Sequence, residues 1–353
     1  MNGEHDASGT EGGGTLVIQT AFLGDVVLTI PLLQRLAARH GPVDVMTTPA
    51  AAPLVATHPA VRLVIPYDKR GADRGWGGFR RMVRTLRAKG YRRAYLAHRS
   101  WRSAALAWLA RIPTRIGFAD APGAPSYTRR IPTPSGVHAI VRYEALAEPR
   151  EGERSEPEPW LALPERDRQA ASAWLLAHGI EGPFVAMAPG SIWNTKRWPY
   201  FAELAARMAL PVVVIGGGQD QALGAAVARG AGARGVNAAG DLTLPESAAV
   251  VERAAALVTN DSAPLHLASA VGTPIVAIFG PTVPAFGFGP LRTGDRVVEH
   301  ADLPCRPCSQ HGPQVCPLGH HRCMKDVGVE QVLSALTEVL NAGEARRAVH
   351  RRD

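Results

Sequence analysis

Short apolar segments of strand length alternate with segments of helical periodicity along most of this 353-residue chain. The expected strands are residues 16–20, 43–47, 63–66 and 93–97, and then 184–188, 212–215, 235–237, 256–259 and 275–279. A helix between two strands returns the chain to the same end of a sheet, so this order favours parallel strands. The alternation therefore restricts the fold to the α/β class.

One stretch interrupts the alternation. Residues 148–164, EPREGERSEPEPWLALP, are rich in Pro, Glu and Arg without periodicity, which is typical of a linker. Since a domain has roughly 150 residues, we predict two Rossmann-like, doubly wound domains that face each other across a cleft. Their expected limits are 15–160 and 165–340, with a closing helix at 331–340 and disordered tails at 1–14 and 343–353.

Charge is distributed unevenly along the chain. Residues 15–147 carry a formal net charge of +14, whereas residues 148–353 carry −3. The basic half predicts a polyanionic partner (nucleic acid, phosphorylated glycolipid or membrane surface) or only a solvated basic face. The most apolar segment, 268–279, is too short to span a membrane and contains Gly272 and Pro274. The first fourteen residues lack Lys and Arg, so no signal peptide is expected and a cytoplasmic protein is predicted.

The first motif is FLGDVV, residues 22–27. Gly24 suits a tight turn, and Asp25 stands where a strand-end loop enters a helix. Asp25 is either a helix N-cap or a carboxylate at the mouth of the cleft that takes a proton from a hydroxyl group.

The second motif is the loop APGSIWNTKRWP, residues 188–199, between a strand and a helix expected to begin at Pro199. Ser191, Thr195 and Lys196 supply small donors and one cation, which suits phosphate oxygens. The spacing is not that of a Walker A loop, and the alternative is an ordinary exposed loop.

The third motif is TNDSAPLH, residues 259–266, where a strand ends and a helix starts near Ser262. Free backbone N–H groups at a helix N-terminus attract anions, and Ser262 and His266 share one helix face. The alternative is an Asp261 or Ser262 cap with a His266 ring packed on the sheet.

The fourth motif, IGGGQD, ends at Asp220, which could hold ribose hydroxyls or cap the next helix. It lacks the dinucleotide fingerprint, which argues against a nicotinamide dehydrogenase.

All four cysteines lie in residues 303–325, and in a cytoplasmic protein this favours metal binding or reduced thiols over disulfides. We expect a structural metal, zinc before an iron–sulfur cluster, and the ligands would be Cys305, Cys308, Cys316 and Cys323.

Taken together, these motifs resemble the ADP-heptose:lipopolysaccharide heptosyltransferase family of bacterial glycosyltransferases. The resemblance covers residues 15–340 and rests on FLGDVVLTIPLL, APGSIWNTKRWP, IGGG and TNDSAPLHLASAVGTPIVAIFGPT. The CxPC…CPLGHHRCM segment resembles one found in many second heptosyltransferases. The resemblance implies a GT-B fold and an inverting transfer of heptose from ADP-L-glycero-D-manno-heptose to the inner core of lipopolysaccharide, as its second heptose.

The resemblance also implies roles for single residues. Asp25 matches the general base, Lys196 the lysine that neutralises the leaving diphosphate, and Asp261 the aspartate that contacts the heptose. The residues matched to the diphosphate site are Ser262, Ala263 and His266, and Asp220 aligns loosely with a ribose-binding acidic residue. This chain departs from many relatives in having Ala263-Pro264 where a glycine follows the serine. No cofactor is required for this chemistry.

The implied acceptor is Kdo-bearing lipid A at the cytoplasmic face of the inner membrane, with no role for nucleic acid. A basic segment with Trp76 and Phe79 would suit peripheral contact with anionic headgroups, and its arginines are Arg80, Arg81, Arg84 and Arg87. Two alternatives stand beside this function. One is a GT-B transferase for another nucleotide sugar or acceptor. The other is a non-catalytic nucleic-acid-binding protein, which the absence of interleaved aromatic and basic residues disfavours.

Overall fold

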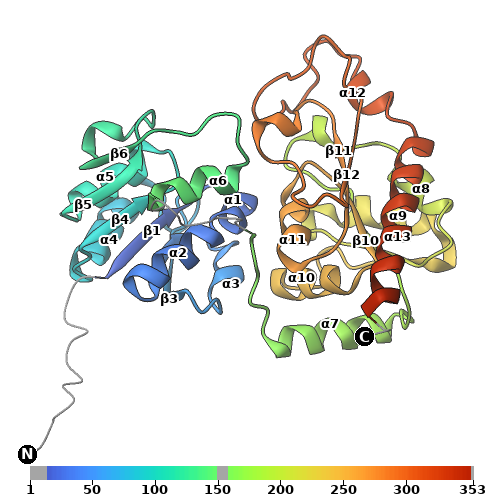
Figure 1. Ribbon diagram of the computed structural model, residues 1–353, viewed down its shortest axis with the longest axis horizontal. Helices are drawn as coiled ribbons and strands as arrows, with labels where there is room; N and C mark the ends of the chain where they lie inside the picture. Colours follow the sequence, from blue (N-terminus) through green and yellow to red (C-terminus); the bar gives the residue numbers. More distant parts are fainter. Residues whose placement is uncertain (1–13, 149–157, 351–353) are drawn as a thin grey trace, which may run out of the picture.

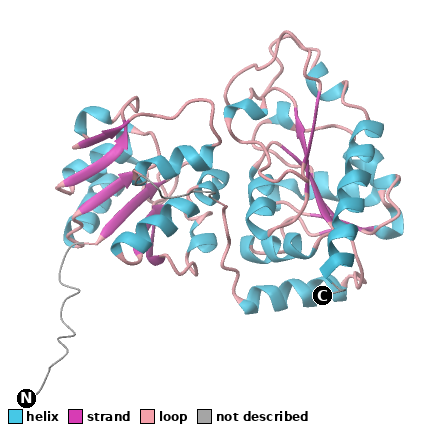
Figure 2. Ribbon diagram, viewed as in Figure 1, coloured by secondary structure: helices cyan, strands magenta, loops and turns pink. Residues whose placement is uncertain are grey.

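The computed structural model describes residues 14–148 and 158–350, with the backbone alone for 344–350. It contains two α/β units, each built on one parallel sheet, and helices lie on both sides of each sheet (Figures 1 and 2). Each sheet takes its strands from only one side of residues 149–157. These observations confirm the predicted α/β class.

The first sheet has the strand order β3-β2-β1-β4-β5-β6. Its strands are β1 (Thr15–Gln19), β2 (Val43–Thr47), β3 (Val61–Pro66), β4 (Arg93–Leu96), β5 (Thr114–Phe118) and β6 (Arg129–Ile131). Its helices are α1 (Leu23–Leu28), α2 (Ile30–His40), α3 (Ala52–Val55), α4 (Gly75–Ala88), α5 (Trp101–Leu109) and α6 (Ala139–Glu144).

The second sheet has the strand order β12-β11-β10-β7-β8-β9, which is the same doubly wound order read from the opposite edge. Its strands are β7 (Val185–Ala188), β8 (Val212–Val214), β9 (Gly235–Asn237), β10 (Ala256–Asn260), β11 (Ile275–Phe279) and β12 (Arg296–Glu299). Its helices are α7 (Glu165–Ala177), α8 (Phe201–Ala206), α9 (Gln221–Gly230), α10 (Leu244–Arg253), α11 (Ala263–Val271), α12 (Arg322–Lys325) and α13 (Val329–His350).

Burial explains why the central strands are apolar runs rather than alternating ones. Every residue of β1, β2, β7, β10 and β11 is buried, because helices cover both faces of a parallel sheet. In both sheets the strand order reverses at the centre, between β1 and β4 and between β7 and β10. Ligands of doubly wound sheets bind beyond the carboxyl ends of strands at such reversals.

The two units meet where α1 of the first contacts α11 of the second, helices that face each other in Figure 1, and where α6 of the first bonds to residues 286–289 of the second. Gly24 lies inside α1 and directly against His266 of α11, where an added Cβ would come 2.5 Å from Cδ2 of the imidazole ring. The absence of a side chain at Gly24 thus lets the two helices approach closely. The tight turn predicted at this residue was wrong, because residue 24 already belongs to α1.

Two other expectations need correction. The helix after the 188–199 loop begins at Phe201, since Pro199 and Tyr200 form a turn before it. The closing helix continues to His350, so the tail predicted from residue 343 is helical as far as that residue. Ala, Glu and Arg favour helix strongly enough to offset the single Gly343. Residues 1–13 and 351–353, the rest of the predicted tails, lie outside the described residues.

Candidate active site

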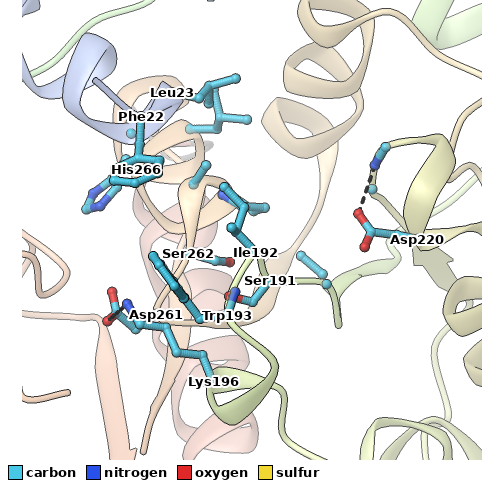
Figure 3. A pocket seen from close by; sticks show the side chains of 18 of the residues that line it. Phe22, Leu23, Ser191, Ile192, Trp193, Lys196, Asp220, Asp261, Ser262 and His266 are labelled. Atoms are coloured by element: carbon cyan, nitrogen blue, oxygen red, sulfur yellow. Dashed lines mark hydrogen bonds and ion pairs between the residues drawn. The ribbon is translucent and has the colours of Figure 1, made fainter. Parts of the chain in front are cut away.

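A cavity of about 820 Å³ lies between the two units. Its walls come from the start of α1, the loop after β7, the three-glycine turn after β8 and the start of α11 (Figure 3). The first, second and fourth of these segments follow β1, β7 and β10, strands that border the reversals in strand order. The topology therefore brings together the motifs that the sequence places far apart.

Asp25 stands in the first turn of α1 and lines this cavity. Its Oδ1 accepts a hydrogen bond from the Tyr143 hydroxyl at 2.5 Å, and its Oδ2 accepts one from the Phe22 backbone N–H at 3.3 Å. Burial raises the pKa of Asp25, and these two hydrogen bonds partly oppose that effect. Phe22, rather than Asp25, is the N-cap residue, so the carboxylate both supports the helix start and reaches the cavity.

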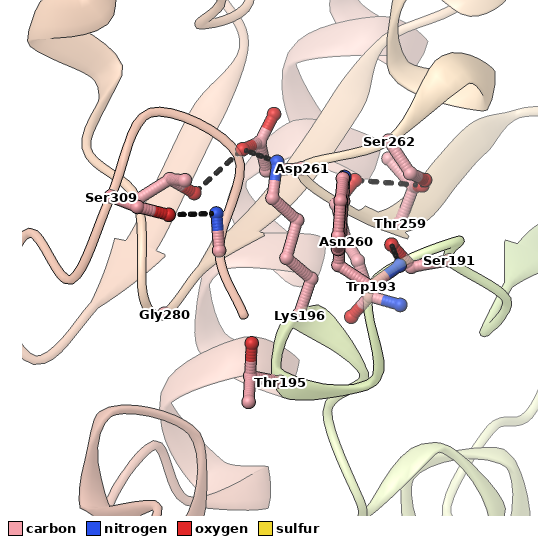
Figure 4. Close-up of polar contacts among 12 residues, drawn as sticks. Ser191, Trp193, Thr195, Lys196, Thr259, Asn260, Asp261, Ser262, Gly280 and Ser309 are labelled. Carbon is pink, nitrogen blue, oxygen red and sulfur yellow. Dashed lines mark hydrogen bonds and ion pairs between the residues drawn. The ribbon is translucent and has the colours of Figure 1, made fainter. Parts of the chain in front are cut away.

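Lys196 and Asp261 form a buried ion pair on the opposite wall (Figure 4). The Lys196 Nζ lies 2.5 Å from Asp261 Oδ2, and the two residues are 8% and 7% exposed. The Thr282 hydroxyl donates to the same Oδ2 at 2.6 Å. One positive and one negative charge thus balance each other in a site that lines the cavity.

The first residues of α11 line the cavity. Ser262 is the N-cap residue, Ala263 begins the helix and Pro264 occupies its first turn, as the sequence predicted. One turn later, burial lowers the pKa of His266 to about 4, which leaves the ring neutral near neutral pH. The ring meets Phe288 edge to face, and its Nδ1 has no hydrogen-bond partner within the described parts of the chain.

Of the other residues predicted to bind the donor sugar nucleotide, some line the cavity and one does not. Ser191 and Asp220 line the cavity. Asp220 accepts from the Gly217 N–H at 3.1 Å, so it serves the turn after β8 while facing the cavity. Thr195 is absent from the cavity wall, because its buried hydroxyl donates to the Pro313 carbonyl.

The cysteine segment, residues 303–325, packs on the loop that carries Lys196. Gln314 donates to the Ile192 carbonyl at 2.9 Å, and a ring nitrogen of His321 contacts the Thr195 carbonyl at 2.8 Å. His311 reaches the cavity between Trp193 and Phe22, with ring-centroid distances of 6.2 and 5.6 Å. The segment therefore shapes the site, which its cysteine spacing did not suggest.

The four cysteines are free thiols. Burial and the neighbouring thiols raise the pKa of Cys323 to about 11, and the same causes raise the pKa of Cys308. Backbone N–H groups lower the pKa of Cys316. Within residues 14–148 and 158–343, no three His, Cys, Asp or Glu side chains have the arrangement of a metal site.

The site joins one carboxylate of raised pKa on the first unit to a lysine and a helix N-terminus on the second. Such an arrangement can take a proton on one side of a cavity and stabilise an anionic leaving group on the other.

Comparison with known proteins identifies the family of this chain. A family model described as glycosyltransferase family 9 (heptosyltransferase) matches residues 79–317. Lipopolysaccharide heptosyltransferase 2 of Salmonella typhimurium is 29% identical over 347 residues, covering 92% of this chain and 98% of the relative. Lipopolysaccharide heptosyltransferase 1 of Pseudomonas aeruginosa is 31% identical, covering 90% and 92% respectively.

A solved structure agrees with these relatives. The structure of E. coli ADP-heptose lipopolysaccharide heptosyltransferase II aligns with a TM-score of 0.76 at 26% identity, covering 94% of this chain and 99% of that one. The fold is therefore the GT-B fold of heptosyltransferases, and the nucleic-acid-binding alternative is not supported. The protein belongs to glycosyltransferase family 9, the heptosyltransferases.

Proposed function

We propose that this glycosyltransferase moves heptose from ADP-L-glycero-D-manno-heptose to the inner core of lipopolysaccharide, as its second heptose and with inversion. The observation that carries the proposal is the placement of Asp25 on one wall of the cavity and of Lys196 and the α11 N-terminus on the other. The printed names of the relatives, heptosyltransferases acting on lipopolysaccharide, support the choice of sugar and acceptor.

The reaction is a single displacement. Asp25 takes the proton of the acceptor hydroxyl, and the acceptor oxygen forms a bond to the anomeric carbon of the donor. The bond between that carbon and the diphosphate oxygen breaks, and ADP leaves with the electron pair. Lys196 and the N–H groups at the start of α11 then stabilise the charge that grows on the diphosphate.

The Lys196–Asp261 pair suits this role. An ammonium group without a counter-ion would be costly to keep in the empty site, and Asp261 supplies that counter-ion. When the diphosphate enters, Lys196 can serve both anions while Asp261 faces the heptose hydroxyls. Ser191 and Asp220 line the adjacent part of the cavity, where the ribose and phosphates would lie.

Two packed helices of the first unit form a surface that suits an anionic membrane. Trp76 is 75% exposed, and Arg80, Arg84 and Arg87 follow it at helical spacing along α4. On α5, Trp101 and Trp108 share one face and are 63% and 57% exposed. Exposed Trp beside Arg is typical of proteins that lie in the headgroup region, where this acceptor would be found.

The two helices pack against each other. Arg87 of α4 donates to the Leu109 carbonyl of α5 at 2.6 Å, and Arg102 of α5 packs over the Phe79 ring of α4 at 5.1 Å. Among the helices that the structure describes, none is apolar over a length sufficient to cross a bilayer. Sedimentation with anionic and with zwitterionic vesicles tests this peripheral contact.

Product analysis tests the function directly. Purified protein is incubated with ADP-heptose and heptose-deficient lipopolysaccharide, and the products are followed by mass spectrometry. We expect addition of heptose and release of ADP. Turnover with another nucleotide sugar but not with ADP-heptose would instead support the alternative GT-B transferase.

Replacement of the base tests the chemical step. Asp25→Asn should lower kcat by about 10²–10⁴-fold, because the amide keeps the shape of the carboxylate but cannot take the proton. Binding of ADP-heptose, measured by calorimetry, should stay near that of the unchanged protein. Asp241→Asn, at an exposed carboxylate, is the control. Activity of Asp25→Asn within a few-fold of normal would leave Asp25 with a structural role only.

Replacement of the cation tests leaving-group stabilisation. Lys196→Ala should weaken donor binding and lower kcat, because it removes the positive charge and leaves the Asp261 carboxylate near the diphosphate without its counter-ion. Adding Asp261→Asn to Lys196→Ala should restore part of the donor binding, since that repulsion is gone. Lys196→Arg should rescue only in part, because a planar guanidinium does not replace an ammonium group. The exposed Lys325 offers a matched control, Lys325→Ala. Unchanged affinity and rate in Lys196→Ala would contradict the assignment.

A structural metal at the cysteine segment is a separate proposal, with zinc preferred over an iron–sulfur cluster. It requires Cys305, Cys308, Cys316 and Cys323 to come together from their described positions, with a histidine able to replace one of them. Elemental analysis of anaerobically purified protein should find near-stoichiometric metal that a Cys305→Ser/Cys308→Ser variant loses. Metal-free protein with full activity and an unchanged melting temperature would remove the proposal. The chemistry above does not use this metal.

A further inference from the structure

The short helix α6 contacts both units and the candidate base. At its start, the Ala139 N–H donates to the Gly287 carbonyl at 2.8 Å, and Nε2 of His138 lies 3.0 Å from the Gly289 carbonyl. Arg142 donates to the Phe286 carbonyl at 3.3 Å. All three acceptors belong to the second unit, so the position of α6 depends on how the units meet.

The far end of α6 is fixed within the first unit. Tyr143 is 8% exposed, and its hydroxyl donates to Asp25 Oδ1 at 2.5 Å. The adjacent Glu144 pairs with Arg35 of α2 at 2.7 Å, with both side chains largely buried. Tyr143 is therefore held from two sides and has little freedom to leave the carboxylate.

The hydrogen bond leaves the two oxygens of Asp25 in unequal positions. Oδ1 accepts the short bond from Tyr143, whereas among the described residues Oδ2 accepts only the 3.3 Å hydrogen bond from the Phe22 N–H. Oδ2 is thus the oxygen with spare capacity to receive a proton. Because Tyr143 keeps its own proton to very high pH, it stays a donor over the whole working range.

We propose that Tyr143 is a positioning residue for Asp25, and that its hydroxyl orients the carboxylate and favours its ionised form when α6 is bonded to the second unit. This inference rests on the proposed function of Asp25 as a base. The ionisation of the base then depends on contact between the two units, because the six-residue helix α6 bonds both to Asp25 and to the second unit.

Several charged or titratable groups also face Asp25. Arg142 on α6 and His311 on the cysteine segment lower its pKa by their charge. His266 packs against α1 at Gly24, but burial holds its pKa at about 4 and its ring neutral. Burial likewise lowers the pKa of His138, at the start of α6.

The test is the pH profile of kcat/KM for Tyr143→Phe. A base must be ionised, so activity falls as the pH drops through the pKa of Asp25. Loss of the Tyr143 hydrogen bond removes an interaction that favours the carboxylate, which raises that pKa. We expect the acidic limb to move to higher pH by about one unit, with activity above the limb reduced by no more than about tenfold.

Three variants control this result. Tyr127→Phe removes another buried hydroxyl, one without a hydrogen-bond partner in the described residues, and should leave the limb in place. His311→Gln should move the limb less than Tyr143→Phe if Asp25 sets it. A fluorinated tyrosine at position 143 keeps the shape of the side chain and strengthens the donor, so it should move the limb to lower pH.

Titration of the Asp25 carboxyl carbon by NMR gives a second measurement that does not need turnover. Its pKa should rise in Tyr143→Phe by the same amount as the acidic limb. An unchanged Asp25 pKa in a folded Tyr143→Phe protein overturns the proposal, and so does an acidic limb that does not move. If instead ADP-heptose gives no product with the unchanged protein while the NMR shift is found, only the proposed function fails.

Discussion

Close contact between α1 and α11 is the constraint on which the site depends. A side chain at position 24 would collide with the His266 ring, since its Cβ would lie 2.5 Å from Cδ2. Asp25 is the next residue along the chain, so this contact brings the candidate base to the helix whose first residues line the cavity. Neither unit holds both groups, and the chemistry exists only where the two units meet.

Buried charges in this cavity serve function more than stability. A buried ion pair contributes little to folding, because removing both ions from water costs about as much as their attraction returns. We therefore infer that the Lys196–Asp261 pair keeps the Lys196 ammonium group in position for an anionic ligand. Asp25 follows the same principle, since its raised pKa makes it a stronger base than an exposed aspartate.

Much of the fold and part of the site could be predicted from the sequence, for reasons particular to each element. Buried parallel strands appear as apolar runs, which made most of the central strands recognisable, whereas the short edge strands β6 and β12 carry too few apolar residues to stand out. Asp25, Ser191 and Asp261 could be singled out because each stands just beyond a central strand. Tyr143 and His311 could not, since neither stands just beyond a central strand: Tyr143 reaches Asp25 from α6, and His311 reaches the cavity from the cysteine segment.

The cysteine segment also makes long-range contacts that its sequence could not predict. Its spacing suggested a metal, but its observed contacts are with the loop that carries Lys196, through Thr195, Gln314 and His321. The spacing of cysteines in a sequence shows which metal ligands a segment contains, but not which distant residues the segment contacts in the fold. The role of Gly24 was hidden for this reason too, because its neighbour His266 lies in the other unit.

The central claim is that the active site is assembled across the α1–α11 contact, and steady-state kinetics of Gly24→Ala tests it most directly. The added methyl group should separate the helices at this point, so kcat should fall by about 10²-fold or more, as expected for misplacement of about 1 Å. ADP binding should change little, because the cavity residues proposed to bind ADP lie in the second unit. Gly77→Ala on α4 is the matched control, because nothing lies within 4 Å of its Cβ position. A folded Gly24→Ala protein with kcat close to that of Gly77→Ala would contradict the account.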